Sequence, residues 1–565
     1  MLKKPIFSRG LTAILVFAAL VVALVLLTRP LSARANTLTV CPSGCQFTSI
    51  EAALSQSQPG DTVSVGPGLY HEHIWLRGGV RVQGAGADKV TLTCDSPWPA
   101  VLGYPQETAG AVIDGFTVVC DSPNSALHFD YPHEKETVSN CVVKNSTGQW
   151  HSGGIYIAFG ATPTIISNTL MGNSLTDGAG GGAILVDNAA PLIRGNTFIS
   201  NTAKSGGAIA VYNGITYTAT IEDNTFIGNT APVRGGAIHV EGSNVVIRNN
   251  RIYSSTATSG AGLALDTGTT GVVEFNDIAF NTASGAGAAG GGISVASGSS
   301  PVLNGNTVRR NTAPAGGGIH ILNAAPRLTN NAIKENAQAE VLVVNSSPVI
   351  VNNVIWGIPP GGVIGFELQG SSSPIIANNI IAYEAIGVRG DGTASPTLRY
   401  NNLWMNTANY SGVAAGTNSL ALNPMLRDAA GGDYHLLSGS PMIDAGNPAD
   451  APAFDIDGDA RPIDGDGDGI ARPDIGLDEF TLAPPTPTPT QTPLPPGSFV
   501  TVTLQYGVNG YQGAEDTYMD NYNATTNFCT ASQLKVGLRW SYQPILRFDL
   551  SPIPADALIT RASLD

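Results

Sequence analysis

The sequence predicts an all-β protein whose main part is a parallel β-helix of about eleven or more coils, and three observations predict it. The first is an asparagine that returns every 22 to 30 residues, at Asn140, Asn168, Asn196, Asn224, Asn250, Asn276, Asn306, Asn331, Asn353, Asn379 and Asn402. A period of this size indicates a solenoid, because a single repeat is too small to bury its own apolar face.

The second observation is a set of three short apolar patches in each repeat. They are a Gly-Gly-Ala-Ile run such as 206–209, a proline-led run such as 191–193, and an Asn-Thr-Phe run such as 196–198. Each patch alternates with period two and predicts a short strand, so that three strands make one coil and pair about 4.8 Å away in the next. We expect the asparagines at the corners, where Asn tolerates left-handed backbone angles, with their amides stacked in a ladder.

The third observation is a deficit of charge. Charged residues make up 13% of the chain, against about 25% in an ordinary soluble domain, as expected when small aliphatic residues fill a long core. The net charge is −15, and an acidic chain is a poor partner for nucleic acid, because phosphate binding needs an excess of Lys and Arg. We therefore exclude nucleic-acid binding.

Residues 1–35 resemble an export signal. Lys3, Lys4 and Arg9 precede the apolar run 13–27, and the small-x-small pattern at 33–35 offers a cleavage site. The chain is therefore expected to be secreted or displayed on the cell surface. An uncleaved signal-anchor is the alternative, and it is the only membrane contact that the sequence predicts.

The cysteines favour an oxidising compartment. Cys41 and Cys45 bracket a tight turn and are expected to form a disulfide. Cys120 has two candidate partners, Cys141 and Cys94, and either choice leaves one thiol free. A zinc site is not favoured, because no second closely spaced Cys or His pair accompanies them.

The start of the solenoid, residues 36–480, has a short amphipathic stretch at 49–55 that predicts a helix over the open end of the core. The runs 49–54, 59–63 and 67–70 resemble the start of bacterial β-helix proteins of the pectin-lyase-like superfamily. The runs "SPMIDAGNP", "DIDGDARP" and "DIGLDEF" between residues 440 and 480 resemble the way many of them end. This resemblance implies a right-handed helix and leaves the function open, since the superfamily holds lyases, hydrolases and adhesins.

Two further segments follow the solenoid. Residues 481–498 form a Pro/Thr-rich linker, expected to be extended. Residues 499–565 resemble the DNRLRE-type β-sandwich, also classed as carbohydrate-binding module family 96, through the runs 516–520 and 547–550. About 70 residues are too few for a complete sandwich, so we expect this domain to be truncated.

An acidic loop between residues 455 and 479 is a candidate Ca²⁺ site. Alternating Asp residues with a Gly at the sixth position match the first half of an EF-hand-like loop, although Ile475 takes the place of its twelfth ligand. The alternative is a solvated acidic turn. The predicted structural Ca²⁺ ligands are Asp457, Asp459, Asp464, Asp466, Asp468 and Asp474.

A column of polar residues follows the Gly-Gly-Ala-Ile strands. If Ile184, Ile209 and Ile238 point inward, the residues three positions later point outward, which gives Asp187, Tyr212, Glu241 and, one coil on, Asp266. Glu241 and Asp266 would lie about 5 Å apart, near the spacing of paired carboxylates in retaining glycosidases, with His239 on the same face. These three residues are the candidate catalytic group. No Arg or Lys is expected in the column, and an ordinary polar strand is the alternative.

A second cluster, His128, Asp130, His133 and His151, has spacing that a metal would permit, but surface histidines are the simpler interpretation. Together the features predict an exported protein that binds or contacts a polysaccharide or cell-surface glycan, with no turnover assigned. The alternatives are a polysaccharide hydrolase or lyase, and an adhesin or structural spacer. The sequence does not identify the oligomeric state.

Overall fold

The computed structural model describes residues 35–94, 97–103, 110–121, 123–131, 135–178, 180–214, 216–359 and 361–481, and the backbone of 514–520 and 542–548. Most of residues 1–35, the linker and nearly all of 499–565 therefore lie outside the described residues. Of the last region, β50 (Ala514–Asp520) and β51 (Tyr542–Phe548) form an antiparallel pair, and its resemblance to a carbohydrate-binding sandwich stays a prediction. Among the described residues, no helix has the length and apolar character needed to cross a membrane.

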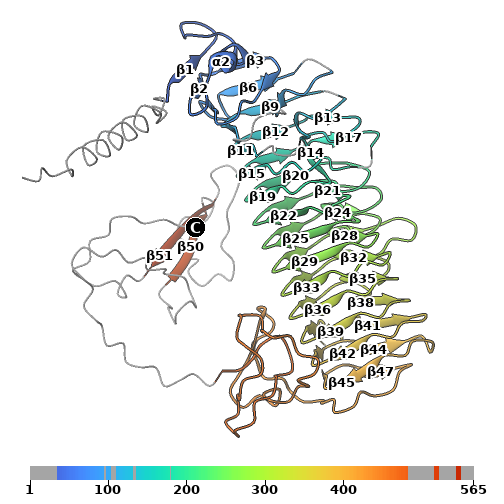
Figure 1. The fold of residues 1–565 in the computed structure, drawn as a ribbon. Coiled ribbons are helices and arrows are strands. Elements are labelled where there is room, and N and C mark those ends of the chain that lie inside the picture. Colours follow the sequence, from blue (N-terminus) through green and yellow to red (C-terminus); the bar gives the residue numbers. More distant parts are fainter. Residues whose placement is uncertain are drawn as a thin grey trace, which may run out of the picture. The chain divides into compact units, whose positions relative to one another are not determined.

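Residues 37–411 form a parallel β-solenoid with three strands in each coil (Figure 1). Sheet A consists of β1 (Thr37–Val40), β2 (Thr62–Val65), β5 (Arg81–Gly84), β8 (Val112–Asp114), β11 (Thr137–Ser139), β15 (Thr164–Ile166), β19 (Leu192–Arg194), β22 (Thr218–Glu222), β25 (Asn244–Arg248), β29 (Thr270–Glu274), β33 (Val302–Asn304), β36 (Arg327–Thr329), β39 (Val349–Val351), β42 (Ile375–Ala377) and β45 (Thr397–Arg399).

Sheet B follows sheet A around each coil. It consists of β3 (Gly68–His71), β6 (Val90–Thr93), β9 (Thr117–Val119), β12 (Val142–Lys144), β16 (Thr169–Met171), β20 (Thr197–Ile199), β23 (Thr225–Ile227), β26 (Arg251–Tyr253), β30 (Asp277–Ala279), β34 (Thr307–Arg309), β37 (Ala332–Lys334), β40 (Val354–Trp356), β43 (Ile380–Ala382) and β46 (Asn402–Trp404).

Sheet C closes each coil. It consists of β4 (Ile74–Trp75), β7 (Val101–Leu102), β10 (Leu127–Phe129), β14 (Ile155–Ala158), β18 (Ile184–Asp187), β21 (Ile209–Tyr212), β24 (Ile238–Glu241), β28 (Leu263–Asp266), β32 (Ile293–Ala296), β35 (Ile319–Leu322), β38 (Ala339–Val344), β41 (Ile364–Gln369), β44 (Ile386–Gly390) and β47 (Ala408–Ser411). Short pairs lie outside these sheets: β13 (Thr147–Gly148) with β17 (Ser174–Leu175), β27 (Thr256–Ala257) with β31 (Thr282–Ala283), and β48 (Leu426–Asp428) with β49 (Asp433–Leu436). The prediction of eleven or more coils is confirmed.

The core is a single column of apolar side chains supplied by alternate residues of every strand. In β20 and β23 the central Phe198 and Phe226 are fully buried and their rings stack at 4.7 Å, while the residues on either side point out. Identical positions in neighbouring coils therefore pack on one another. This repetition explains why the sequence period is so regular.

The recurring asparagines form the predicted ladder, but they do not take the left-handed angles. The Asn196 side-chain nitrogen donates to the Asn224 side-chain oxygen at 3.0 Å, and Asn224 donates in the same way to Asn250. Positive φ angles belong to the preceding residues, such as Gly195 and Asp223. The corner expectation was wrong because the amide must point inward to reach the next coil, so the preceding residue makes the sharp bend.

The two ends of the predicted series lie outside this ladder. Asn140 is exposed with φ 51°, and the last ladder member is Asn401 rather than Asn402. A second ladder runs through the asparagines five residues further on, as between Asn173 and Asn201. The solenoid thus has two internal lines of amides, one at each end of sheet B.

The N-terminal end carries the expected helix, α2 (Ile50–Gln56), which begins after Ser49 and buries Ile50, Ala53 and Leu54. Cys41 and Cys45 are disulfide-bonded, as predicted. Cys120 pairs with Cys94, and Cys141 is a buried free thiol, so the pairing of Cys120 with Cys141 was wrong. Cys141 stands directly after a corner and its side chain points into the core, where no cysteine of a neighbouring coil meets it.

Residues 423–481, the C-terminal segment, fold back along the outside of sheets A and B at the far end of the solenoid (Figure 1). Tyr434, Met442 and Ile475 of this segment form a second apolar cluster with Val354 and Ile380 of sheet B. Because the segment covers apolar outer positions, the strands beneath it are buried on both faces.

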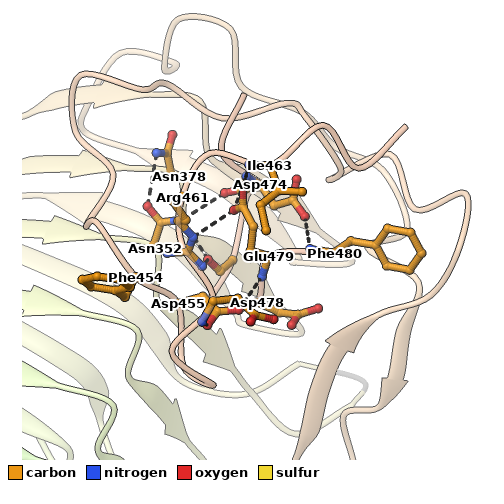
Figure 2. Close-up of polar contacts among 12 residues, drawn as sticks. Asn352, Asn378, Phe454, Asp455, Arg461, Ile463, Asp474, Asp478, Glu479 and Phe480 are labelled. Carbon is orange, nitrogen blue, oxygen red and sulfur yellow. Dashed lines mark hydrogen bonds and ion pairs between the residues drawn. The ribbon is translucent and has the colours of Figure 1, made fainter. Parts of the chain in front are cut away.

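Polar contacts also hold the C-terminal segment. The corner residue Asn352 donates to the carbonyl oxygens of Asp474 and Gly476 at 2.9 and 2.8 Å. Arg461 is almost fully buried, and its Nε lies 3.0 Å from Glu479 Oε2 (Figure 2). The runs "DIDGDARP" and "DIGLDEF" thus supply the two partners of one buried ion pair, and Arg461 also bonds to Asn330 of the solenoid.

Candidate functional site

The predicted outer column exists in the expected register. Asp187 pairs with Tyr212, Tyr212 with Glu241, and Glu241 with Asp266 on adjacent strands of sheet C. The inward residues Ile184, Ile209 and Ile238 are fully buried, as the alternation required. Strand alternation therefore places the four side chains in one line on the outer face of sheet C.

Asp266 has more partners than the strand pattern predicts. Its carboxylate lies 3.1 Å from Arg234 Nη1 and 3.3 Å from His239 Nε2, and its side chain is only 5% exposed. The expectation that no Arg or Lys joins the column was wrong. Arg234 belongs to the turn before β24 and forms a bridge with Ser205 and Ser259, so its position follows from the turn and not from the strand.

His239 occupies an outward position of β24 but is only 2% exposed. The preceding turn passes so close that a Cβ on Gly235 would lie 2.7 Å from the His239 backbone nitrogen. Its Nδ1 lies 3.2 Å from the Tyr212 hydroxyl. The imidazole therefore lies between Tyr212 and Asp266 beneath the surface, with a hydrogen bond to Tyr212 and an Nε2 that has no hydrogen-bond partner among the described residues.

Glu241 and Tyr212 are the members of this group that remain half-exposed. One oxygen of Glu241 accepts a bond from the Thr267 hydroxyl at 3.4 Å. Burial, and then the charge of Glu241, raise the pKa of Tyr212, so the phenol stays protonated and can donate. The group offers a ligand one carboxylate and one hydroxyl, while Asp266 is shielded. Whether Glu241, Asp266 and His239 act in catalysis stays a prediction.

An aromatic cluster lies on the same face toward the N-terminus. His128 of β10 pairs in register with Tyr156 of β14, and their rings lie 4.8 Å apart. The His151 ring stacks on Tyr156 at 4.1 Å, and the His128 Nε2 lies 3.0 Å from Asp130. Three of the four predicted members meet here, and His133 lies outside the described residues.

Sequence reasoning missed the rings around this cluster. Phe159 directly follows β14 and is 56% exposed, and Trp150, in the turn between β13 and β14, is 60% exposed. Phe159 has φ 49°, whereas Asn188 and Asn213 hold the same corner in the next coils. The run "GIYIAF" contains the signal, because a large aromatic replaces the small corner residue of other repeats.

The predicted Ca²⁺ ligands do not converge on one point. Asp464 and Asp466 come together with Asp444, whereas Asp457 lies with His435 and Asp478. Asp474 is buried and accepts backbone N–H groups of Asp444 and Phe480 (Figure 2), and burial raises its pKa to about 8. The remaining predicted ligands, Asp459 and Asp468, belong to neither group.

The six predicted carboxylates do not come together at one point in the described part of the chain, and whether any of them bind Ca²⁺ stays a prediction. Several loop carboxylates bond to nearby backbone, as Asp464 does with Gly467 and Gly469 at 2.7 and 2.9 Å. These bonds shape the turns and separate the carboxylates. The spacing of the Asp residues does not reveal this, because it contains no information on Asp444 or His435.

Comparison with family models agrees with this architecture. A model described as the right handed beta helix region matches residues 108–236 and 182–355. The solenoid has the right-handed β-helix fold. A model described as periplasmic copper-binding protein (NosD) matches residues 288–425, and no curated protein matches the chain.

Several solved structures are similar at low identity. The A-module of mannuronan C-5 epimerase AlgE4 from Azotobacter vinelandii is 14% identical, with a TM-score of 0.31, over 66% of this chain and 95% of that one. The catalytic domain of a GH87 α-1,3-glucanase is 13% identical, with a TM-score of 0.33, over 70% and 69%. Pectate lyase Pel9A is 12% identical, with a TM-score of 0.25, over 80% and 97%. We take neither activity nor substrate from them.

The copper named by the second family model is not supported by the residues present. Within 288–425 the only histidine is His320, and there is no cysteine. His320 is buried, which lowers its pKa to about 4, and its Nδ1 bonds to no described residue. Copper sites need several imidazole or sulfur ligands at one point, and this span does not supply them.

Proposed function

We propose that the β-helix is exported and binds a polysaccharide along the outer face of sheet C without cleaving it. The observation that carries the proposal is the set of half-exposed polar side chains on the outer face of sheet C, His128 of β10, Asp187 of β18, Tyr212 of β21 and Glu241 of β24. From β10 to β24 there are four steps of about 4.8 Å, or about 19 Å in all, the length of several sugar units. An extended polymer fits such a surface better than a small molecule does.

The chemistry of the face suits sugar rings. Phe159 offers an exposed ring directly after β14, and Trp150 offers one in the turn before that strand. Tyr212, Asp187 and Glu241 offer hydroxyl and carboxylate groups further along the face. Sugar hydroxyls both donate and accept, so a row of such groups satisfies them, while the rings cover their apolar faces. The shielding of Asp266 by Arg234 and His239 favours binding over cleavage.

Export is supported by two independent features. The first is the signal-like pattern of residues 1–35. The second is the match of residues 288–425 to a family described as periplasmic. The two disulfides, Cys41–Cys45 and Cys94–Cys120, also fit an oxidising compartment.

The proposal is tested by affinity electrophoresis of the full-length protein on gels that contain different polysaccharides. We expect one polymer to retard the wild type, and the Trp150→Ala/Phe159→Ala double variant to lose most of that retardation. Ile227→Ala is the matched control, because Ile227 is an exposed apolar residue of sheet B, away from the face. Equal retardation of all three proteins, or none on any polymer, would refute the proposal.

We also propose that Ca²⁺ stabilises the C-terminal segment at Asp444, Asp464 and Asp466. These residues bring one carboxylate oxygen each within 4.8 Å of the others, and Ca²⁺ prefers such oxygen ligands. Ca²⁺ should raise the thermal midpoint of the wild type but not of Asp466→Asn. Asp468→Asn, two residues away and outside the triad, should keep the response. An unchanged wild-type midpoint between Ca²⁺ and EGTA would contradict a Ca²⁺ site.

A further inference from the structure

A second site lies on another face of the solenoid. A cleft of about 590 Å³ is enclosed by the outer face of sheet A and by residues 451–458 of the C-terminal segment. Its volume falls within the range of about 300 to 1,000 Å³ that is usual for small-molecule sites. We propose that this cleft binds a short neutral oligosaccharide, independently of the outer face of sheet C.

Two phenylalanine rings line the cleft. Phe275 is 44% exposed and Phe454 is 59% exposed, and Figure 2 shows Phe454 apart from the buried Arg461 network. The Phe275 ring lies across Gly305, where an added Cβ would come within 2.6 Å of it. Because Gly305 has no side chain, the Phe275 ring can lie against it, where the ring forms part of the cleft wall.

The backbone at Phe275 points to a role beyond the fold. Phe275 has φ 54°, a conformation that is unfavourable for a bulky residue, and in the neighbouring coils Asn249 and Gly305 hold this corner. Because 44% of its surface is exposed, the ring gains only part of the packing that would offset this strain. Such outliers occur at binding sites more often than elsewhere.

Three polar side chains that line the same cleft, Arg327, Asn304 and Glu274, retain unused hydrogen-bonding capacity. Arg327 donates through Nη2 to the Asp450 carbonyl at 2.9 Å, and its Nε and Nη1 bond to no described residue. The Asn304 oxygen accepts from Thr329 at 2.8 Å, which leaves its nitrogen free among the described residues. The Glu274 carboxylate likewise has no hydrogen bond to a described residue. Free donors and a free acceptor side by side match the paired hydroxyls of a sugar ring.

The charge of the cleft selects against acidic sugars. Glu274, Asp455 and Asp457 line it, and Arg327 is the only cation among its described lining residues. Asp455 is bonded to backbone N–H groups, and Asp457 is paired with His435, whose pKa is raised to about 9 by its hydrogen bonds to Asp457 and Asp433. His435 therefore neutralises Asp457, and Glu274 and Asp455 exceed Arg327 by one negative charge. A uronate carboxylate would be repelled here, whereas an uncharged sugar would not.

The test is isothermal titration of the full-length protein with β-1,4-linked hexasaccharides of glucose, xylose and mannose. We expect at least one to bind, and Phe454→Ala and Arg327→Met each to weaken it by about tenfold or more. Phe280→Ala is the matched control, since Phe280 is also exposed in a positive-φ corner of the same coil but does not line the cleft. It should bind as the wild type does.

Two further probes separate this site from the other face. The Trp150→Ala/Phe159→Ala variant should retain hexasaccharide binding in the cleft even if retardation on polysaccharide gels is lost. Hexagalacturonate should not bind at the cleft. The proposal is overturned if no neutral hexasaccharide binds, if the Phe454 and Arg327 variants bind as the wild type does, or if hexagalacturonate competes at this position.

Discussion

At the scale of single residues, the buried ion pair of Arg461 and Glu479 shows how the C-terminal segment is held. Arg461 also donates from Nη1 to the Asn330 side-chain oxygen at 3.0 Å and from Nη2 to the Gly476 carbonyl at 3.2 Å. Glu479 accepts from the backbone nitrogens of Ile463 and Asp474. Every charge is therefore compensated within a region that excludes water.

Removing one partner should leave the other charge buried without compensation. We predict that Arg461→Met lowers the free energy of unfolding of the C-terminal segment by about 3 to 5 kcal/mol. The exposed pair of Arg194 and Asp223 provides the control, and Arg194→Met should cost less than about 1 kcal/mol. Urea unfolding followed by limited proteolysis measures both. A loss of similar size in the two variants would contradict this account.

Glu340 and Glu384 present the opposite situation, two buried acids without a cation. Glu340 is fully buried and accepts from the Asn336 backbone at 3.0 Å and from its side chain at 2.6 Å. Both Glu384 oxygens lack a hydrogen bond among the described residues. Burial raises the pKa of Glu384 to about 8, and burial and the neighbouring Glu384 raise the pKa of Glu340.

This shift predicts a pH dependence with a definite sign. The folded state holds the Glu384 proton more tightly than the unfolded chain, whose Glu pKa is about 4.5. Stability should therefore fall as pH rises from about 4.5 to about 8, by up to about 1.4 kcal/mol per pH unit, and this loss should end above the folded pKa. Glu384→Gln should reduce the slope in chemical unfolding, whereas Glu274→Gln on sheet A should not. Identical slopes in wild type and Glu384→Gln would contradict the prediction.

At the scale of elements, the asparagine ladders hold adjacent coils together through buried hydrogen bonds. Asn224 accepts from the backbone nitrogen and side chain of Asn196 and donates to the Ile193 carbonyl and to Asn250. Each member satisfies backbone groups of adjacent coils in a region without water. Each ladder amide therefore bonds to the coil before it and to the coil after it, and so links three coils.

Loss of one amide should be costly because several groups lose partners together. We predict that Asn224→Ala destabilises the solenoid by about 3 kcal/mol or more, since each buried group left without a bond costs about 1 to 3 kcal/mol. Asn244→Ala, on the outer side of β25 and bonded only to Thr218 and Thr270 side chains, should cost less than about 1 kcal/mol. Thermal unfolding compares the two. Equal midpoints would show that the ladder contributes little.

The same elements show which features of the structure a sequence can predict. Period-two alternation and the repeat length are local properties, so the strands, the coil and the column from Asp187 to Asp266 followed from them. The contact of Arg234 with Asp266 could not be predicted in this way, because Arg234 reaches Asp266 from a turn whose path depends on neighbouring coils. The arrangement of the aspartates between 457 and 474 could not be predicted for a related reason. They bond to backbone groups of their own turns or lie beside the distant His435 and Asp444.

At the scale of the whole solenoid, two outer faces have different surroundings. The outer face of sheet C presents its polar column and the exposed ring of Phe159 at the end of β14. The outer face of sheet A is partly covered by the C-terminal segment, which encloses the cleft beside Phe454. Both faces combine exposed rings with carboxylates. A rigid solenoid keeps such groups at fixed spacing, which favours recognition of a repeating polymer.

The most direct test of the central claim is a combined binding and product assay on the full-length protein with added Ca²⁺. Each polysaccharide is assayed for retention, for new reducing ends and for unsaturated products, beside the Glu241→Gln/Asp266→Asn variant. The account predicts retention of the wild type with no product in either protein. Product formed by the wild type and lost in the variant would contradict it, and would make the column on sheet C a catalytic site.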